Sequence, residues 1–365
     1  MTGPVPNPGI LDIAPYIGGE ARAEVATRLI RLASNEGAFG PSPKAMAAYK
    51  ALAGDVHRYP DGGSSALRDG LGRHFGLDPA RIVCSSGSDE VLQLLARCYA
   101  GPDTEVLHSR HGFLIYPIAA KSVGATPVAA PERNLTADVD ALLSKVTDRT
   151  RILYLANPNN PTGSYLPRSE VARLHAGLPP HVLLVIDAAY AEYITEEDYS
   201  DGTELAERFD NVVVTRTFSK IFALGGLRLG WAYCPPAVAD VLNRVRGPFN
   251  VSSAAQAAGL AALDDTEFVR KSRDHNTACR AWFTEAVRGL GLTVHPSVGN
   301  FVLVSFAGQT GEKSNAEAAR LFLKSRGILV RQMGAYSLPD CLRMTIGLQD
   351  EMEEVVKALG EWVGG

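Results

Sequence analysis

A lysine and an arginine stand close together in the stretch 215–231, and their spacing suits one kind of chemistry. Lys220 follows Ser219 shortly after the apolar run 212–214, and Arg228 comes eight residues later, past a glycine pair. A lysine amine that loses its proton in a sheltered pocket forms imines, and an arginine grips a phosphate with a forked pair of donors. The stretch therefore suits a site that holds a phosphate and forms an imine. Each of these residues alone is more often found on a surface or in a loop.

Two other loops carry polar residues directly after apolar runs. Asp187 ends the run 182–186, and a charge at the end of a buried strand is costly unless it has a partner. Tyr190, three residues later, can face the same pocket. Asn160 lies in the loop 157–163, which its prolines hold in one shape, so its amide is a dependable hydrogen-bond donor. A plain turn is the alternative for this loop.

A glycine-serine turn at 85–90 joins the short apolar strand 81–84 to the helix predicted at 91–99. Such a turn presents free backbone amides, here those of Ser88 and Asp89, and the positive end of the helix dipole favours an anion. An ordinary strand-to-helix turn is the alternative. Phe113 follows the strand predicted at 105–108, where its ring either stacks on a flat heterocycle or belongs to the core.

Strands and helices must alternate to bring these loops together. The predicted strands are 81–84, 105–108, 125–129, 151–156, 182–186 and 211–215, and the predicted helices are 44–52, 64–75, 91–99, 137–143 and 168–177. This order predicts an open, mostly parallel α/β sheet over residues 34–250, with right-handed crossovers. Ligands bind outside the carboxyl ends of strands in such sheets. We therefore expect one crevice lined by the Gly87 turn, Phe113, Asn160, Asp187, Tyr190 and Lys220.

The two ends of the chain have a different pattern. Residues 251–365 begin with helices to about 290 and continue with strands at 292–295, 300–304, 328–331 and 342–346, which predicts a smaller α+β domain. Arg331 and Arg343 lie on or beside two of these strands, as surface cations or as grips on an anionic substrate. Residues 1–33 are predicted to form an arm that joins the small domain, with a helix at 20–31.

Bulk composition narrows the class of protein. A chain of 365 residues exceeds what one core usually supports, which agrees with two domains. The net charge of −4, without a basic cluster, argues against a nucleic-acid partner. No signal peptide and no apolar run of membrane-spanning length are present. The five cysteines have no metal-ligand spacing, so we expect reduced thiols, no metal and a cytoplasmic location.

One cofactor has functional groups that match this set of residues. Pyridoxal 5′-phosphate has an aldehyde for Lys220, a pyridine nitrogen that Asp187 can keep protonated, and a ring oxygen for Asn160 and Tyr190. Its phosphate matches the amides of Ser88 and Asp89, the Ser219 hydroxyl and Arg228, and Phe113 is predicted to cover the ring face.

Several runs resemble a known family. The runs NPNNPTG (157–163), DAAY (187–190) and RTFSKIFALGGLRLGW (216–231), with GSDE (87–90) before them and LRMTIG (342–347) after, are similar to fold-type I aminotransferases of the histidinol-phosphate aminotransferase group. The resemblance extends over nearly the whole chain, from APYIG (14–18) and LASNE (32–36) to Arg343.

The resemblance implies roles that spacing alone does not. Lys220 would also be the base that moves a proton between the substrate carbon and the cofactor carbon. The enzyme would be a homodimer in which Tyr59 reaches the cofactor phosphate of the neighbouring subunit. The implied substrate-side residues are Tyr16, Asn35, Arg331 and Arg343, with Arg343 meeting the carboxylate of glutamate or the anionic end of the substrate.

Two positions depart from the group's pattern, and both bear on substrate preference. Phe113 stands where a tyrosine is commoner, and Gly37 stands where asparagine is frequent.

The implied reaction is amino-group transfer between L-histidinol phosphate and 2-oxoglutarate in histidine biosynthesis. An aromatic amino acid aminotransferase and a threonine-phosphate decarboxylase share the framework and stay open. A nucleotide-binding oxidoreductase or a binding module is disfavoured, because neither G-x-G-x-x-G nor G-x-x-x-x-G-K occurs.

Overall fold

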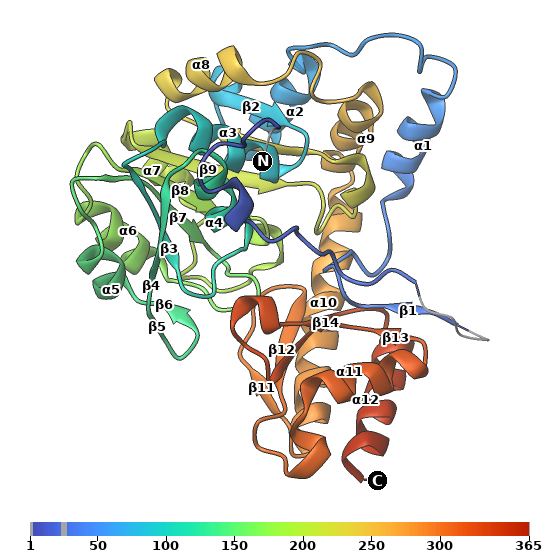
Figure 1. Cartoon of the computed structure of the whole chain (residues 1–365). Coiled ribbons are helices and arrows are strands. Elements are labelled where there is room, and N and C mark those ends of the chain that lie inside the picture. The colour runs from blue at the N-terminus through green and yellow to red at the C-terminus, as the bar shows by residue number, and fades with distance from the viewer. Residues whose placement is uncertain (1–2, 23–27, 365) are drawn as a thin grey trace.

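A seven-stranded sheet forms the centre of the larger part of the molecule (Figure 1). The computed structural model describes residues 3–22 and 28–364. Every neighbouring pair of strands is parallel except those that include β10, which is antiparallel to both of its neighbours. The predicted mostly parallel sheet is confirmed, whereas β10 was not predicted. In order across the sheet the strands are β2 (Ile82–Ser85), β10 (Gly230–Tyr233), β9 (Val212–Thr217), β8 (Leu183–Asp187), β7 (Thr150–Ala156), β3 (Glu105–Ser109) and β4 (Thr126–Ala130).

Both faces of this sheet are covered by helices, which explains why its strands are apolar without alternation. Successive side chains of a strand point to opposite faces. In β8, Leu184 and Ile186 therefore belong to one buried cluster and Leu183 and Val185 to the other. A strand that is buried on both sides needs apolar residues at every position.

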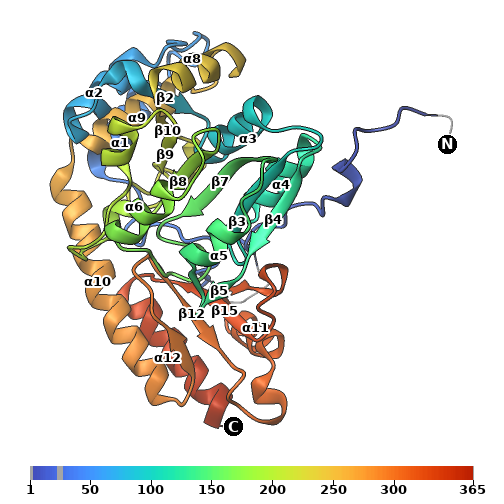
Figure 2. The same cartoon turned by 90° about the vertical axis from the view of Figure 1, so that its left-hand side faces the viewer.

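The helices form two layers around the sheet (Figure 2). One layer contains α3 (Ser88–Tyr99), α4 (Ile115–Ser122) and α8 (Pro236–Val245). The other contains α1 (Pro43–Ala51), α2 (Ser65–Phe75), α5 (Val139–Ser144), α6 (Arg168–Ala176), α7 (Thr203–Arg208) and α9 (Ser253–Leu263). The predicted helices lie within a few residues of α1, α2, α3, α5 and α6, whereas α4, α7 and α8 were not predicted.

The start of α2 is not capped by the serine at its N-cap position. Ser64 has φ 50 and its side chain makes no capping bond. The carboxylate of Asp61 instead accepts hydrogen bonds from the amides of Gly63 at 2.8 Å and Ser65 at 2.6 Å. These bonds lower the pKa of Asp61. The predicted position of the helix start is right, but its capping residue lies three positions earlier, where a carboxylate reaches the free amides better than a short hydroxyl.

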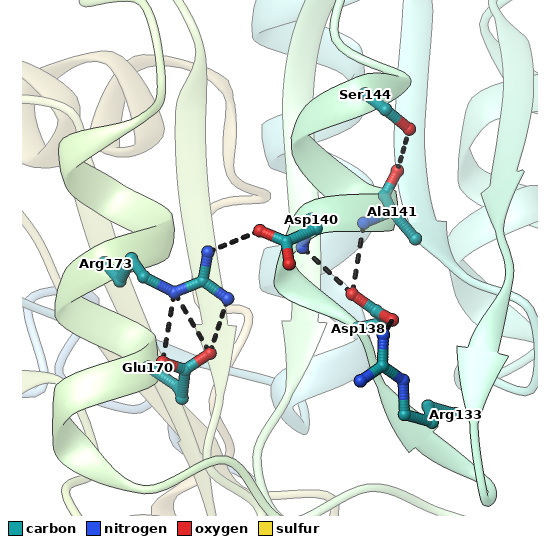
Figure 3. A network of polar contacts seen from close by, with 7 residues as sticks. All are labelled: Arg133, Asp138, Asp140, Ala141, Ser144, Glu170 and Arg173. Atoms are coloured by element: carbon teal, nitrogen blue, oxygen red, sulfur yellow. Dashed lines mark hydrogen bonds and ion pairs between the residues drawn. The ribbon is translucent and has the colours of Figure 1, made fainter.

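A polar network joins α5 to α6 on the outer surface (Figure 3). Asp138 caps α5 by accepting from the amides of Asp140 at 3.0 Å and Ala141 at 3.2 Å. Arg173 of α6 pairs with Glu170 at 2.7 Å and with Asp140 at 2.5 Å. Exposed ion pairs of this kind contribute at most about 1 kcal/mol. The network therefore adds little to stability.

The smaller part of the molecule has its own sheet and core. The sheet is antiparallel, in the order β11 (Thr293–His295), β12 (Phe301–Ser305), β15 (Cys341–Thr345) and β14 (Arg331–Gln332). Its core includes residues of α10 (Thr266–Gly289), α11 (Ala316–Ser325) and α12 (Gln349–Gly364).

At both ends of the range 20–31, where a helix was predicted, the chain is not helical. Residues 20–22 and 28–29 are not helical, residues 30–31 form β1, and residues 23–27 lie outside the described part. β1 (Ile30–Arg31) pairs in parallel with β13 (Ile328–Leu329). Ile30 is 1% exposed within the small core, so a partner distant in sequence outweighs the local preference for helix.

Residues just after the predicted domain boundary at 250 pack with the larger part of the molecule. Ala255, Ala258 and Leu263 of α9 are buried in the core of the larger part, and α9 packs on α1 and α2. After α9, the next residues in the core of the smaller part belong to α10 and include Cys279 and Phe283. The boundary after residue 250 remains a prediction, and this packing favours a change-over within α10.

Across residues 3–22 and 28–364, no helix is both long and apolar enough to span a membrane. The same residues contain no group of three or more histidine, cysteine or acidic side chains that could hold a metal ion.

Candidate active site

A cavity of about 250 Å³ lies at the carboxyl ends of the central strands, beside the smaller part of the molecule. Loops that follow β2, β3, β7, β8 and β9 supply one side of it, and residues 16–19 and 33–35 with strands β14 and β15 supply the other. It brings together every predicted site residue except Tyr59. The lining includes Tyr16, Asn35, Ser88, Asp89, Phe113, Asn160, Asp187, Tyr190, Ser219, Lys220, Arg228, Arg331 and Arg343.

Lys220 occupies the turn that follows β9. Its Nζ donates to the carbonyl oxygen of Ser34 at 3.1 Å and lies 5.7 Å from the ring centre of Tyr190. Loss of water contact lowers the pKa of Lys220 to about 8, and the positive charge of Arg343 acts in the same direction. A neutral amine, the form that attacks carbonyl carbon, is therefore well populated at mildly alkaline pH.

Asp187 ends β8 with its carboxylate buried. Its Oδ2 accepts from the Tyr116 hydroxyl at 2.8 Å and its Oδ1 accepts from the Thr215 hydroxyl at 3.1 Å. Burial raises the pKa of Asp187 to about 6, and the two hydrogen bonds oppose that rise. The carboxylate is thus ionised at neutral pH while surrounded by protein.

Sequence reasoning missed both donors to Asp187. Thr215 lies directly opposite Asp187 on the neighbouring strand, so the pairing of β8 with β9 would have revealed it. Tyr116 lies one helical turn after Phe113, and that spacing was the available signal.

Tyr190 and Asn160 face the cavity from neighbouring loops. The Tyr190 hydroxyl accepts from Nδ2 of Asn35 at 2.8 Å, and burial raises the pKa of this phenol. Asn160 lies in a loop with two cis X-Pro bonds, and its Oδ1 accepts from the Arg343 guanidinium. Its amide nitrogen is left as the group that can donate to a ligand.

A cradle for an anion lies where α3 begins. Gly87 precedes α3 with φ 81, and no side chain caps the first turn, which contains Ser88 and Asp89. Nη1 of Arg228 lies 3.3 Å from the Ser219 hydroxyl. A Cβ added at Gly87 would lie 2.4 Å from Nη2 of Arg228, so glycine is what leaves the cradle open. Free amides, a hydroxyl and a guanidinium suit a phosphate.

The side of the cavity opposite the anion cradle, which we call the rim, carries Arg331 and Arg343 and is cationic. Arg331 of β14 and Arg343 of β15 are directly paired across two neighbouring strands. Arg343 donates to the carbonyl of Ala33 at 2.9 Å, and its buried Nε has no hydrogen-bond partner among the described residues. Arg331 donates to the carbonyl of Ile17 at 2.5 Å, and its guanidinium carbon lies 5.6 Å from the ring centre of Tyr16. This rim suits an anionic group next to an aromatic ring.

Three positions singled out from the sequence lie as follows. Tyr59 is 82% exposed, stacks on Phe249 at 4.7 Å and does not line the cavity. Phe113 lines the cavity with its ring edge-on to Tyr116 at 6.0 Å. A Cβ at Gly37 would lie 2.8 Å from Cβ of Ala223, so an asparagine would not fit there without movement of the loop that contains Lys220.

Comparison with known proteins agrees with this geometry. The model of the family "Aminotransferase class I and II" matches residues 27–359. The chain belongs to the class I and II aminotransferases. This confirms the resemblance and the enzyme class that the sequence motifs predicted, and it leaves the nucleotide-binding oxidoreductase and the non-catalytic module without support.

Named aminotransferases match over the full length. The histidinol-phosphate aminotransferase of Rhodospirillum centenum is 71% identical, with 100% of both chains covered. That of Paramagnetospirillum magneticum is 61% identical, also with 100% of both covered. A crystal structure of histidinol-phosphate aminotransferase from Sinorhizobium meliloti in complex with pyridoxal-5′-phosphate superimposes with a TM-score of 0.86. It is 31% identical, with 92% of this chain and 91% of that chain covered.

Proposed function

We propose that this aminotransferase transfers the amino group between L-histidinol phosphate and 2-oxoglutarate with pyridoxal 5′-phosphate as cofactor. The observation that carries the proposal is that Lys220, Asp187 and an anion cradle share one cavity. The substrate follows from the full-length relatives, which are named for histidinol phosphate. The aromatic aminotransferase and the phosphate-specific decarboxylase are not favoured by those names.

The residues present fit this cofactor. A Cβ at Gly87 would lie 2.4 Å from Nη2 of Arg228, so glycine leaves this guanidinium room in the cradle. Asp187 is a buried carboxylate with no cation in hydrogen-bond contact among the described residues. When bound, pyridoxal phosphate supplies an aldehyde that condenses with amines and a ring that accepts electrons. The residues that would hold it are Ser88, Asp89, Phe113, Asn160, Asp187, Tyr190, Ser219, Lys220 and Arg228.

Four side chains have proton-transfer or hydrogen-bonding roles in this proposal. With the cofactor bound, the neutral Nζ of Lys220 would accept a proton from the substrate carbon and return it to the cofactor carbon, a role that its lowered pKa of about 8 favours. The Asp187 carboxylate would hold the proton on the ring nitrogen. Tyr190 and Asn160 would donate to the ring oxygen.

The rim supplies substrate recognition. Arg331 and Arg343 together match a phosphate or a carboxylate, and the ring of Tyr16 lies beside Arg331 where an imidazole can stack. Asn35 donates to Tyr190 and accepts from Thr345 at 3.2 Å, so it joins the two parts of the molecule at the site.

The proposal includes a cytoplasmic homodimer with shared sites. Tyr59 is exposed on the loop before α2 and lies outside its own cavity, which supports the idea that it reaches the cofactor phosphate of a second subunit. The arm 1–33, the large domain 34–250 and the small domain 251–365 are proposed as the three segments of the subunit.

Turnover of three substrates by the purified protein tests the function. With 2-oxoglutarate we expect rapid glutamate formation from histidinol phosphate, slower formation from phenylalanine, and no release of carbon dioxide from threonine phosphate. No turnover of histidinol phosphate would overturn the proposal, and faster turnover of phenylalanine would favour the aromatic alternative.

A further inference from the structure

Tyr116 lies behind Asp187, outside the cavity, and contacts two residues assigned to the cofactor ring. Its hydroxyl donates to Oδ2 of Asp187 at 2.8 Å, and its ring meets Phe113 edge-on at 6.0 Å. The side chain is 0% exposed and is absent from the cavity lining. One buried tyrosine thus connects the carboxylate at the ring's edge to the phenyl group at its face.

The tyrosine is itself held firmly. Its ring stacks on Tyr154 at 4.8 Å with an angle of 9°, and the Tyr154 hydroxyl donates to the carbonyl of Leu92 at 2.6 Å. Tyr116 belongs to the first turns of α4, whose residues Ile115 and Ala119 pack in the same core. A hydroxyl fixed in this way keeps its direction when a ligand enters.

Asp187 depends on these donors because its carboxylate is 5% exposed and has only neutral hydrogen-bond partners among the described residues. A buried charge is tolerated when hydrogen bonds replace its water. Among those residues Tyr116 is the donor to Oδ2, and Thr215 serves Oδ1. Removal of the Tyr116 hydroxyl therefore favours the protonated acid, which cannot hold a proton on a ring nitrogen.

We propose that Tyr116 is a positioning residue for the cofactor's ring nitrogen, acting through Asp187. Its hydroxyl keeps the Asp187 carboxylate ionised and oriented, and its ring edge sets the place of Phe113. This inference rests on the proposed function, because it needs a pyridoxal cofactor in the cavity.

Comparing the binding of two ligands, one with the ring nitrogen and one without it, distinguishes this role of Tyr116 from a purely packing role. The variant Tyr116→Phe keeps the stacked ring and loses the hydroxyl. We would titrate it by absorbance with pyridoxal phosphate and with the analogue in which a C–H group replaces the ring nitrogen. The Kd of pyridoxal phosphate is expected to rise about 10-fold or more, the range of a hydrogen bond to a charged group. The Kd of the analogue is expected to stay within about twofold, because Asp187 has no nitrogen to bind there.

Tyr154→Phe is the matched control, since it removes a buried hydroxyl from the same stacked pair without touching Asp187. Both ligands should bind it as they bind the wild type. Thr215→Val removes the other donor to Asp187 and should show the same selective loss as Tyr116→Phe. It serves as the test if Tyr116→Phe is poorly folded.

The pH profile gives a second readout. Binding that needs ionised Asp187 weakens as the pH falls through the pKa of Asp187. In Tyr116→Phe that weakening should begin at a pH higher by about one unit. Equal losses for both ligands, or no loss for either, would overturn the role of Tyr116. A wild-type protein that binds neither ligand would instead overturn the proposed function.

Discussion

The amine of Lys220 should titrate well below an ordinary lysine. Its pKa is lowered to about 8 by burial and by Arg343, so the reactive neutral form grows as the pH rises through that value. Acetic anhydride labelling of the cofactor-free protein, followed by mass spectrometry of the peptides, should show a midpoint near pH 8 at Lys220. Lys50, which is exposed on α1, is the internal reference. Identical profiles for the two lysines would contradict the assignment.

The buried charge of Asp187 should cost stability and support activity. Its pKa is raised from 3.8 to about 6, so the folded protein binds this proton more tightly than the unfolded chain does. The cost is absent below pH 4, grows as the pH rises from 4 to 6, and reaches at most about 3 kcal/mol above that.

The variant Asp187→Asn removes this charge with little change of shape. In the cofactor-free state, its gain in unfolding free energy over the wild type should appear only as the pH rises above about 4. Transamination by the loaded variant should fall by more than about 100-fold, because the ring nitrogen loses its charged partner. Urea titrations across pH and single-turnover assays measure the two effects, and a normal rate would contradict the role of Asp187.

The sequence predicted which residues line the site better than it predicted which other residues they contact. Lys220, Asp187 and Asn160 follow apolar runs, and a strand end is visible in the sequence, so their convergence could be inferred. Tyr116 and Thr215 were missed because their contacts with Asp187 depend on strand register and on how α4 packs against β8. The spacing of Tyr116 from Phe113 suggests a shared helix face, but it does not reveal the contact with Asp187.

At the scale of elements, the start of α3 depends on Gly87. In Gly87→Ala the methyl carbon would lie 2.4 Å from Nη2 of Arg228 and displace the guanidinium. The backbone at φ 81 and ψ 157 is also one that essentially only glycine adopts, which adds about 1–3 kcal/mol of strain. We expect a Kd for pyridoxal phosphate about 10-fold higher, with little change for pyridoxal, which has no phosphate.

Gly76→Ala at the end of α2 is the matched control for this substitution. Gly76 has φ 71 and ψ 33, the ordinary left-handed conformation, and open space around its Cβ position. Gly76→Ala therefore tests a positive φ without touching the cradle, at a backbone cost no larger than that at Gly87. Equal cofactor affinity in the two variants would show that Gly87 serves the backbone alone.

Two elements show what a sequence pattern leaves undetermined. β10 is as apolar as its neighbours, and its antiparallel direction follows from the short return through residues 218–229, which contains no crossover helix. The sequence of β1 predicted a helix, because its strand partner β13 is almost three hundred residues away and leaves no local signal. The length of a connection decided the first case, and a strand partner distant in sequence decided the second.

At the scale of the whole molecule, Tyr59 should act in a neighbouring subunit. Homodimers of Lys220→Ala should be inactive and lack the imine absorption, and homodimers of Tyr59→Ala should bind the cofactor more weakly. Mixed dimers of the two variants contain one site with both residues intact, so tight binding should return at that site. Light scattering and cofactor titration of the mixture measure this, and an additive response would place Tyr59 outside the partner's site.

Arg331 and Arg343 lie directly opposite each other on neighbouring strands, and the repulsion between their positive charges destabilises the rim. Like charges directly opposite on neighbouring strands cost roughly 0.2–1 kcal/mol, and burial lowers the pKa of Arg343 further. An anion seated between them relieves that repulsion, so binding and folding are coupled at this edge of the small sheet. Millimolar phosphate should then raise the melting temperature of the cofactor-loaded protein more than chloride at equal ionic strength. The thermal stability of the protein becomes a gauge of how fully its substrate rim is occupied.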